Sequence, residues 1–257
     1  MESTPSVIGL FLAGIIAGAI NSVAGGGSLI SFPALIAFGI PPIPANATNT
    51  AAVLPGSISS SIAYRKDLLG HYDGPFLSLF LPSLAGGLIG AVVLAATPSE
   101  LFSRIVPFLI LFATILFAGR DYFSHLMNSS SQTTGSISLM ARMWGFSFQF
   151  FVAAYGGYFG AGIGILMLAS FSLMGMRDIH KMNAMKTLLA SIINGTALLY
   201  FIMRGLIVWP VALIMASGAI LGGYLGARMA KRVNQKVLWL FIVAVGLSVS
   251  AWMFFRM

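Results

Sequence analysis

The stretch that decides the fold is NSVAGGGSLISFP at residues 21–33, where three consecutive glycines interrupt an otherwise apolar run. In a soluble protein, a glycine cluster of this kind would suggest a turn that cradles phosphate. The apolar segments on both sides predict instead a break in a membrane helix. A partner stretch, YGGYFGAGIG at residues 155–164, follows later in the chain. We interpret the two glycine clusters as paired helix breaks that together form an anion-binding site.

The composition predicts an all-α polytopic membrane protein. The 257 residues are 58% hydrophobic and 8% charged, whereas a soluble domain is about 25% charged. So few charges cannot keep this much apolar surface in water. The absence of cysteine excludes disulfides, thiolate chemistry and Cys-ligated metals. The first residues lack a basic segment, so we expect the first apolar run to remain as a helix and not to be a cleaved signal peptide.

Ten apolar runs divide the chain, at residues 6–24, 28–38, 46–64, 75–96, 101–119, 137–159, 164–174, 182–203, 207–227 and 237–255. Most are long enough to span a hydrocarbon core of about 30 Å. Residues 28–38 and 164–174 are not, because each would extend only about 16 Å as a helix. A Ser-rich polar loop at 124–136, which the topology derived below places in the cytoplasm, separates a first membrane repeat, 1–123, from a second, 137–257, within one membrane domain.

The two halves carry the same landmarks in the same order. A shift of 137 residues places Gly25 on Gly162 and Asn46 on Asn183, and a shift of 136 places the Gly86 pair on the Gly222 pair. For glycine pairs of the latter kind we favour tight helix packing. For the two clusters that precede half-length helices, we favour a functional break.

The distribution of Lys and Arg predicts that the repeats are inverted. If each glycine-broken unit crossed the membrane, the split between the two sides would be 8 to 6. If each unit returns to its starting side and is followed by three spanning helices, the split becomes 11 to 3. The positive-inside rule favours the second topology, in which the protein crosses the cell membrane several times and both termini lie on its outer side, in the periplasm or the extracellular space. Such inverted repeats are typical of secondary transporters. The net charge of +8 therefore marks a membrane side and does not indicate nucleic-acid binding, because the basic residues are scattered between apolar runs.

The helix breaks are suited to bind an anion. A helix that starts after a break presents free N–H groups and the positive end of its dipole. Ser28 adds a hydroxyl, which we expect to be the N-cap of its half-helix. The predicted substrate-binding residues lie at the two breaks and on the helices that follow them: Gly25, Gly26, Gly27, Ser28, Asn49, Thr50, Gly162, Gly164, Asn183, Lys186, Thr187 and Asn194.

For several of these side chains a purely structural role remains open. Lys186 lies five residues past Lys181, about 7 Å deeper along a helix, and it either faces the substrate or snorkels to the interface. Asn49 and Asn194 either bind substrate or join helices.

Other classes of site are disfavoured. The six carboxylates and three histidines lie in loops or at the ends of runs, so we find no buried proton relay or cation site. We find no metal cluster, no nucleophile paired with a base and no Walker-type loop. We therefore predict no enzyme activity and no cofactor.

At these residues the sequence resembles the TauE/SafE sulfite-exporter family, also called the toluene-sulfonate uptake permease family. The resemblance covers nearly the whole chain and rests on AGGGSLISFPAL at 24–35, ATNTAA at 47–52, GAGIG at 160–164 and KTLLASIING at 186–195. The family often has Thr-Asn-Lys where this chain has Thr48-Asn49-Thr50. Members are described as moving small sulfur-containing or carboxylated anions such as sulfite, sulfoacetate or other sulfonates.

The resemblance and the residues together predict a secondary transporter, more readily an exporter, of such an anion by alternating access. The expected partners are a small anionic substrate and the lipid bilayer, and a homodimer is left open. An anion channel, an uptake permease and a non-transporting membrane partner are the alternatives.

Overall fold

The computed structural model describes residues 4–65, 79–119, 139–174, 176, 179–229 and 235–255. Within these ranges the regular elements are helices, and each overlaps one of the ten apolar runs. They are α1 (Thr4–Val23), α2 (Ser28–Ala37), α3 (Pro42–Ala63), α6 (Phe80–Ala96), α7 (Ser99–Ala118), α9 (Leu139–Tyr158), α10 (Ile163–Leu173), α11 (Ile179–Met203), α12 (Trp209–Met229) and α13 (Gln235–Phe254).

The helices have the character of membrane spans. Ser99–Ala118, Lys181–Met203 and Trp209–Met229 are long and apolar enough to cross a bilayer. Large hydrophobic side chains point outward along several helices, including Leu81, Phe151 and Leu240 at 63–69% exposure. Such exposure is costly in water and favourable in lipid. The predicted fold class, an all-α polytopic membrane protein, is confirmed.

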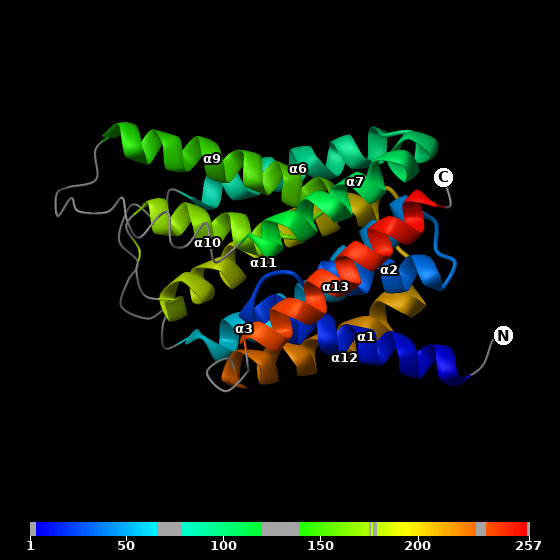
Figure 1. Ribbon diagram of the computed structural model, residues 1–257. Coiled ribbons are helices and arrows are strands. Elements are labelled where there is room, and N and C mark those ends of the chain that lie inside the picture. Colours follow the sequence, from blue (N-terminus) through cyan, green and yellow to red (C-terminus); the bar gives the residue numbers. More distant parts are fainter. Residues whose placement is uncertain are drawn as a thin grey trace.

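Two sets of parallel helices form the body of the protein (Figure 1). In the first set, α1, α3 and α12 run in the same direction, since Thr48 bonds Val208 near the start of α12 and Ser60 bonds Gly223 near its end. In the second set, α6, α9 and α11 share a direction. Both glycine pairs pack against backbone, because a side chain on Gly86 would collide with the carbonyl of Phe150 and one on Gly222 with that of Ile15. The interpretation of these pairs as packing positions is confirmed.

The short helices α2 and α10 turn back along the helices that precede them. Phe38, just after α2, packs on Gly9 near the start of α1, and Met174, just after α10, packs on Gly145 near the start of α9. The helix pairs α1–α2 and α9–α10 therefore each enter the protein and return to the end from which they started. The two pairs enter from opposite ends, because α3 follows the first pair and α11 the second, and these two helices run in opposite directions (Figure 1).

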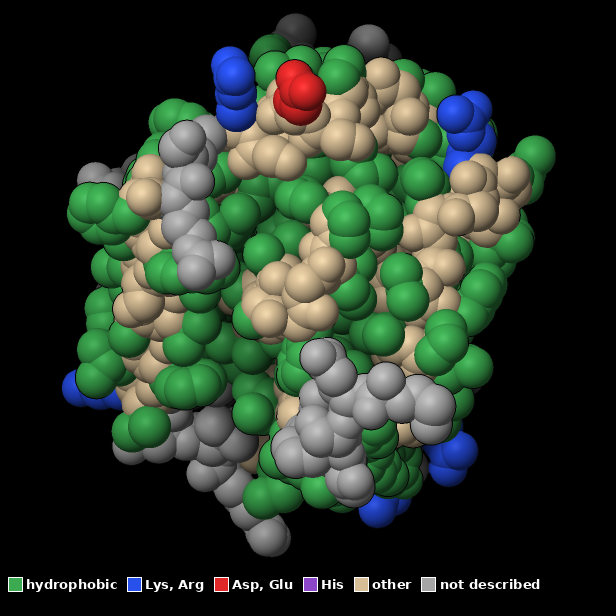
Figure 2. Space-filling model, turned by 90° about the vertical axis from the view of Figure 1, so that its right-hand side faces the viewer, with side chains coloured by type: hydrophobic (Ala, Val, Ile, Leu, Met, Phe, Trp, Pro, Cys, Tyr) green, Lys and Arg blue, Asp and Glu red, His purple; other side chains and the backbone are tan. Residues whose placement is uncertain are grey.

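This is the arrangement that two inverted repeats would produce. The repeat relation itself, and the boundary at 124–136, stay predictions, since that loop lies outside the described residues. The start of α1 and the end of α13 lie at one end of the molecule (Figure 1). Figure 2 faces this end, where hydrophobic and uncharged side chains fill the middle and the few charged side chains lie toward the edge. Which end faces the cytoplasm also stays a prediction.

Candidate functional site

The two glycine breaks touch each other at the centre of the protein. A methyl group added to Gly25 would lie 2.7 Å from the Cα of Gly164, and one added to Gly164 would lie 2.6 Å from the Cα of Gly25. Gly25 and its repeat counterpart Gly162 have the same φ of 79°, a value that favours glycine. The structure thus brings the two breaks together and gives the paired glycines one backbone conformation.

Each break leaves backbone amides without a backbone acceptor. The amides of Leu29 and Ile30 donate to the carbonyls of Gly26 and Gly27, and the amide of Ile165 donates to Gly162. Among the described residues, the amides of 26–28 and 161–164 have no such bond. Buried amides in a low-dielectric interior favour an anionic acceptor.

The expectation that Ser28 caps α2 is wrong. The cap position is Gly27, with φ −58° and ψ −35°, and no side chain caps this helix. Ser28 is already the first helical residue, because Gly27 has adopted helical dihedrals. Its hydroxyl oxygen instead accepts a hydrogen bond of 3.1 Å from the Asn49 amide.

Asn49 of α3 joins α3 to the half-helix α2. Its Nδ2 donates to Ser28, and its Oδ1 accepts a 2.5 Å hydrogen bond from the hydroxyl of Ser31. All three side chains are buried. In this conformation Asn49 therefore joins helices, as one of its two interpretations had it, while the Ser28 hydroxyl hydrogen remains available to a ligand.

A small cavity lies beside these residues and extends to the second break. Its volume is about 10 Å³, enough for one water-sized sphere. Asn194 of α11 lines it, is 6% exposed, and makes no hydrogen bond with another described residue. The polar residues and glycine around the cavity are Asn21, Ser28, Asn49, Thr50, Gly160 and Asn194. Asn21 and Gly160 are absent from the predicted site, although both flank a glycine cluster.

Lys186 of α11 lies beside the contact between the breaks, one helical turn before Ala190, which lines the cavity. It is 2% exposed, so it does not snorkel to the interface. Its Nζ donates to Asn183 Oδ1 at 2.8 Å and to the carbonyl of Ser22 at 3.3 Å, while its side-chain stem lies against Gly164. Glu100, the one carboxylate in the described ranges, lies in the first turn of α7. The ammonium is therefore held by neutral oxygens and by the negative end of the α1 dipole.

Each half of the chain caps a long helix of the other half. Lys186 of the second half donates to the carbonyl of Ser22 near the end of α1. Asn46 of the first half donates at 2.9 Å to the carbonyl of Tyr158, the last residue of α9. Asn46 is missing from the predicted site. Its alignment with Asn183 is the signal in the sequence that points to it, although its partner lies 112 residues away.

The remaining predicted residues make contacts within their own helix or with α7. The hydroxyl groups of Thr50, which lines the cavity, and of Thr187 donate to carbonyls of their own helices. Gly26 packs against Phe117, and Gly162 against Ala113, both on α7. Within the described part of the chain, no three metal-ligating side chains gather as a metal site would require.

Comparisons with known proteins identify the family of the chain. Residues 10–253 match the family model described as Sulfite exporter TauE/SafE. A probable membrane transporter protein of Sinorhizobium is 30% identical over 94% of this chain and 89% of its own length. Similar proteins of the same description occur in Haemophilus influenzae, at 29% identity over 94% of this chain and 92% of the relative, and in Escherichia coli, at 29% over 96% and 90%. No solved structure matches. The chain belongs to the TauE/SafE sulfite exporter family of membrane transporters.

Proposed function

We propose that the protein is a secondary carrier of a small sulfur-containing anion, such as sulfite, sulfoacetate or another sulfonate. The observation that carries the proposal is the contact between the Gly25 and Gly164 breaks, which gathers the unbonded amides of both half-helices at one place. Neutral hydrogen-bond donors from Ser28 and Asn194 would bind the anion's oxygens, and the Lys186 ammonium would offset its charge.

The electrostatics of the described residues favour an anionic ligand. A buried, desolvated ammonium costs several kcal/mol unless it is compensated. Among the described residues, Lys186 donates to an amide oxygen and a backbone carbonyl and to no carboxylate. These neutral acceptors leave a net positive charge, from which a negatively charged ligand that approaches the breaks would gain. A cationic substrate would be repelled by it.

The size of the cavity supports a carrier that changes conformation. At about 10 Å³ it holds one water-sized sphere and no oxyanion. Binding therefore requires the half-helices to separate from α3 and α11. Alternating access, in which one repeat moves against the other, would provide this motion. A permanently open anion channel would need a wider path.

Export is the favoured direction. With the cell interior negative by ~150 mV, expulsion of a divalent anion gains about 7 kcal/mol, from about 2.3 kcal/mol per charge per 100 mV. Uptake against this potential would require a coupling ion. An uptake permease is therefore the second choice.

A thermal-shift screen of the purified protein tests the proposal directly. The ligands are sulfite, sulfoacetate, taurine, thiosulfate and simple carboxylates at one ionic strength. We expect a saturable rise in the unfolding temperature with at least one sulfur oxyanion, and we expect Lys186→Met to abolish it. Arg204→Gln, which removes an exposed cation at the end of α11, is the matched control and should keep the full shift.

Flux into proteoliposomes separates the alternatives. A carrier gives saturable, selective uptake of the ligand found in the screen, whereas a channel gives conductance without saturation. A non-transporting partner gives neither flux nor a shift. An anion-dependent shift that is unchanged in Lys186→Met would remove this lysine from the site.

A further inference from the structure

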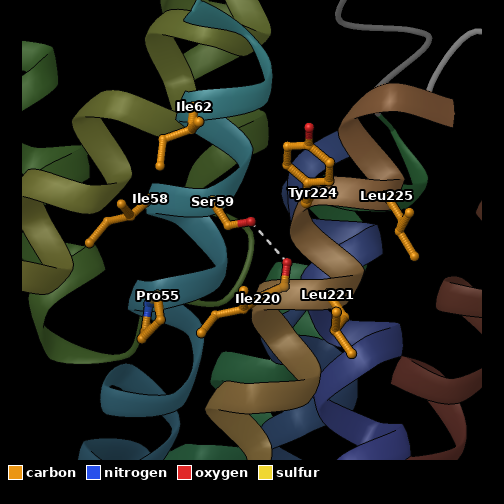
Figure 3. Close-up of a pocket in the computed structure, with 8 residues that line it drawn as sticks. All are labelled: Pro55, Ile58, Ser59, Ile62, Ile220, Leu221, Tyr224 and Leu225. Atoms are coloured by element: carbon orange, nitrogen blue, oxygen red, sulfur yellow. Dashed lines mark hydrogen bonds between the residues drawn. The ribbon is translucent and has the colours of Figure 1, made fainter.

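A wide apolar groove lies on the outside of the protein between α3 and α12 (Figure 3). Its volume is about 570 Å³, more than fifty times that of the buried polar cavity. Two hydroxyl groups belong to its described lining residues: that of Ser59 already donates to the carbonyl of Ile220 at 2.9 Å, and that of Tyr224 points out of the groove (Figure 3). Among the described residues, the walls therefore offer a small hydrophilic anion no free donor, and we do not assign the groove as a second substrate site.

The groove faces the bilayer and not the protein interior. Ile58 and Ile62 of α3 and Leu221 and Leu225 of α12 line it and are 46–53% exposed. Along α3 it extends from Pro55 to Ile62, about 11 Å of helix. This is roughly a third of a hydrocarbon core of about 30 Å. Its dimensions suit a lipid acyl chain that lies along the helices.

One end of the groove is positively charged. Tyr224 stands at this end with its hydroxyl directed out of the groove (Figure 3), and the guanidinium of Arg228 lies 4.6 Å from the centre of its ring. Arg65 follows α3 at the same level, because Ser60 bonds Gly223 and each arginine lies five residues beyond that contact. Both arginines are exposed.

We propose that the groove is a binding site for an anionic phospholipid. The acyl chain lies between α3 and α12, and the phosphate binds Arg228 and Arg65. A guanidinium recognises phosphate through two parallel N–H groups, and its stacking on Tyr224 fixes its orientation. Basic sites at the ends of membrane helices favour anionic headgroups in this way.

A second copy of the chain is a poorer occupant. A two-fold interface places the same patch of both copies face to face. In a membrane both copies keep the same depth, so the two Arg228 side chains would approach each other. The like charges would oppose association, whereas a phosphate neutralises them.

The test compares lipids that differ only in the headgroup. Purified protein in mild detergent is heated with phosphatidylglycerol or phosphatidylcholine of identical chains, and with inorganic phosphate alone. We expect phosphatidylglycerol to raise the unfolding temperature and the other two to leave it nearly unchanged. Native mass spectrometry on the same samples should show retained phosphatidylglycerol.

Variants assign the effect to the groove. Arg228→Gln should raise the half-saturating concentration of phosphatidylglycerol about fivefold. The value for Arg228→Lys should fall between those of Arg228→Gln and the wild type. Leu221→Trp, which fills the groove, should reduce lipid retention without removing charge. Arg204→Gln, at the opposite end of the molecule, is the control and should behave like the wild type.

The proposal is overturned if both lipids give equal shifts, if inorganic phosphate reproduces the shift, or if Arg228→Gln retains lipid like the control. It is also overturned if Leu221→Trp changes the oligomeric state and leaves lipid retention intact, because a second copy would then occupy the groove.

Discussion

The contact between the two glycine breaks can be tested with three single substitutions to alanine. Gly39 has a φ of 81° and nothing within 4 Å of an added methyl group, so Gly39→Ala measures the backbone cost alone. Gly164 lacks a positive φ but meets the backbone of Gly25 at 2.6 Å, so Gly164→Ala measures the steric cost alone. Gly25→Ala combines both, with φ 79° and a contact of 2.7 Å.

The expected losses of unfolding free energy follow from these geometries. A left-handed residue with a side chain costs about 1–2 kcal/mol, and overpacking a tight contact costs about 1–3 kcal/mol. We therefore expect about 1–2 kcal/mol for Gly39→Ala, about 1–3 kcal/mol for Gly164→Ala and about 2–5 kcal/mol for Gly25→Ala. The entropy that alanine removes from the unfolded chain is similar at all three positions and cancels in the comparison.

The assay is reversible unfolding in mixed micelles of a mild detergent and dodecyl sulfate, followed by far-ultraviolet circular dichroism. Both atoms in the Gly25–Gly164 contact belong to the backbone, so no flexible side chain can move aside to relieve it. If Gly25→Ala costs no more than Gly39→Ala, and Gly164→Ala costs nothing, then the breaks are not in contact and the reasoning fails.

Three further substitutions probe the interior. Ser83→Ala should lower the unfolding free energy by about 1–3 kcal/mol, because it removes the 2.8 Å acceptor of the buried Gln149 amide; the double variant with Gln149→Met should recover part of this loss in the same unfolding assay, and no recovery would argue against the bond. Asn49→Ala should cost a similar amount, about 1–3 kcal/mol, since it leaves Ser31 without its buried side-chain acceptor; unchanged stability would show that water replaces the amide. Gly195→Ala, with nothing within 4 Å in the middle of α11, should raise the unfolding free energy by about 0.8–1 kcal/mol, and a loss would reveal a contact at that position.

The helices could be predicted from the sequence because the bilayer imposes a simple rule. Each apolar run must satisfy its own backbone hydrogen bonds, so run length translates into helix length. The half-helices α2 and α10 followed from the same rule, since both runs are too short to span and both follow glycines. The presence of each helix was therefore predictable, and its ends were predictable to within a few residues.

The partners of the buried polar side chains could not be predicted. The bond from Lys186 to Ser22 joins residues 164 positions apart, and no local pattern encodes such a pairing. Ser28 failed as a cap because the dihedrals of Gly27 depend on how it packs against Ala17 and Asn21 of α1, which a glycine triplet leaves undetermined. The groove between α3 and α12 was missed because its residues look like ordinary lipid-facing side chains.

The mutual capping of α1 and α9 has a consequence for biosynthesis. The carbonyl of Ser22 enters the membrane early and receives its donor from Lys186 only after 164 further residues have been made. During that time the end of α1 depends on water or on chaperoning contacts, since an unsatisfied carbonyl in hydrocarbon costs several kcal/mol. The amino-terminal half expressed alone should therefore be rapidly degraded, and co-expression of the carboxy-terminal half as a separate chain should rescue it.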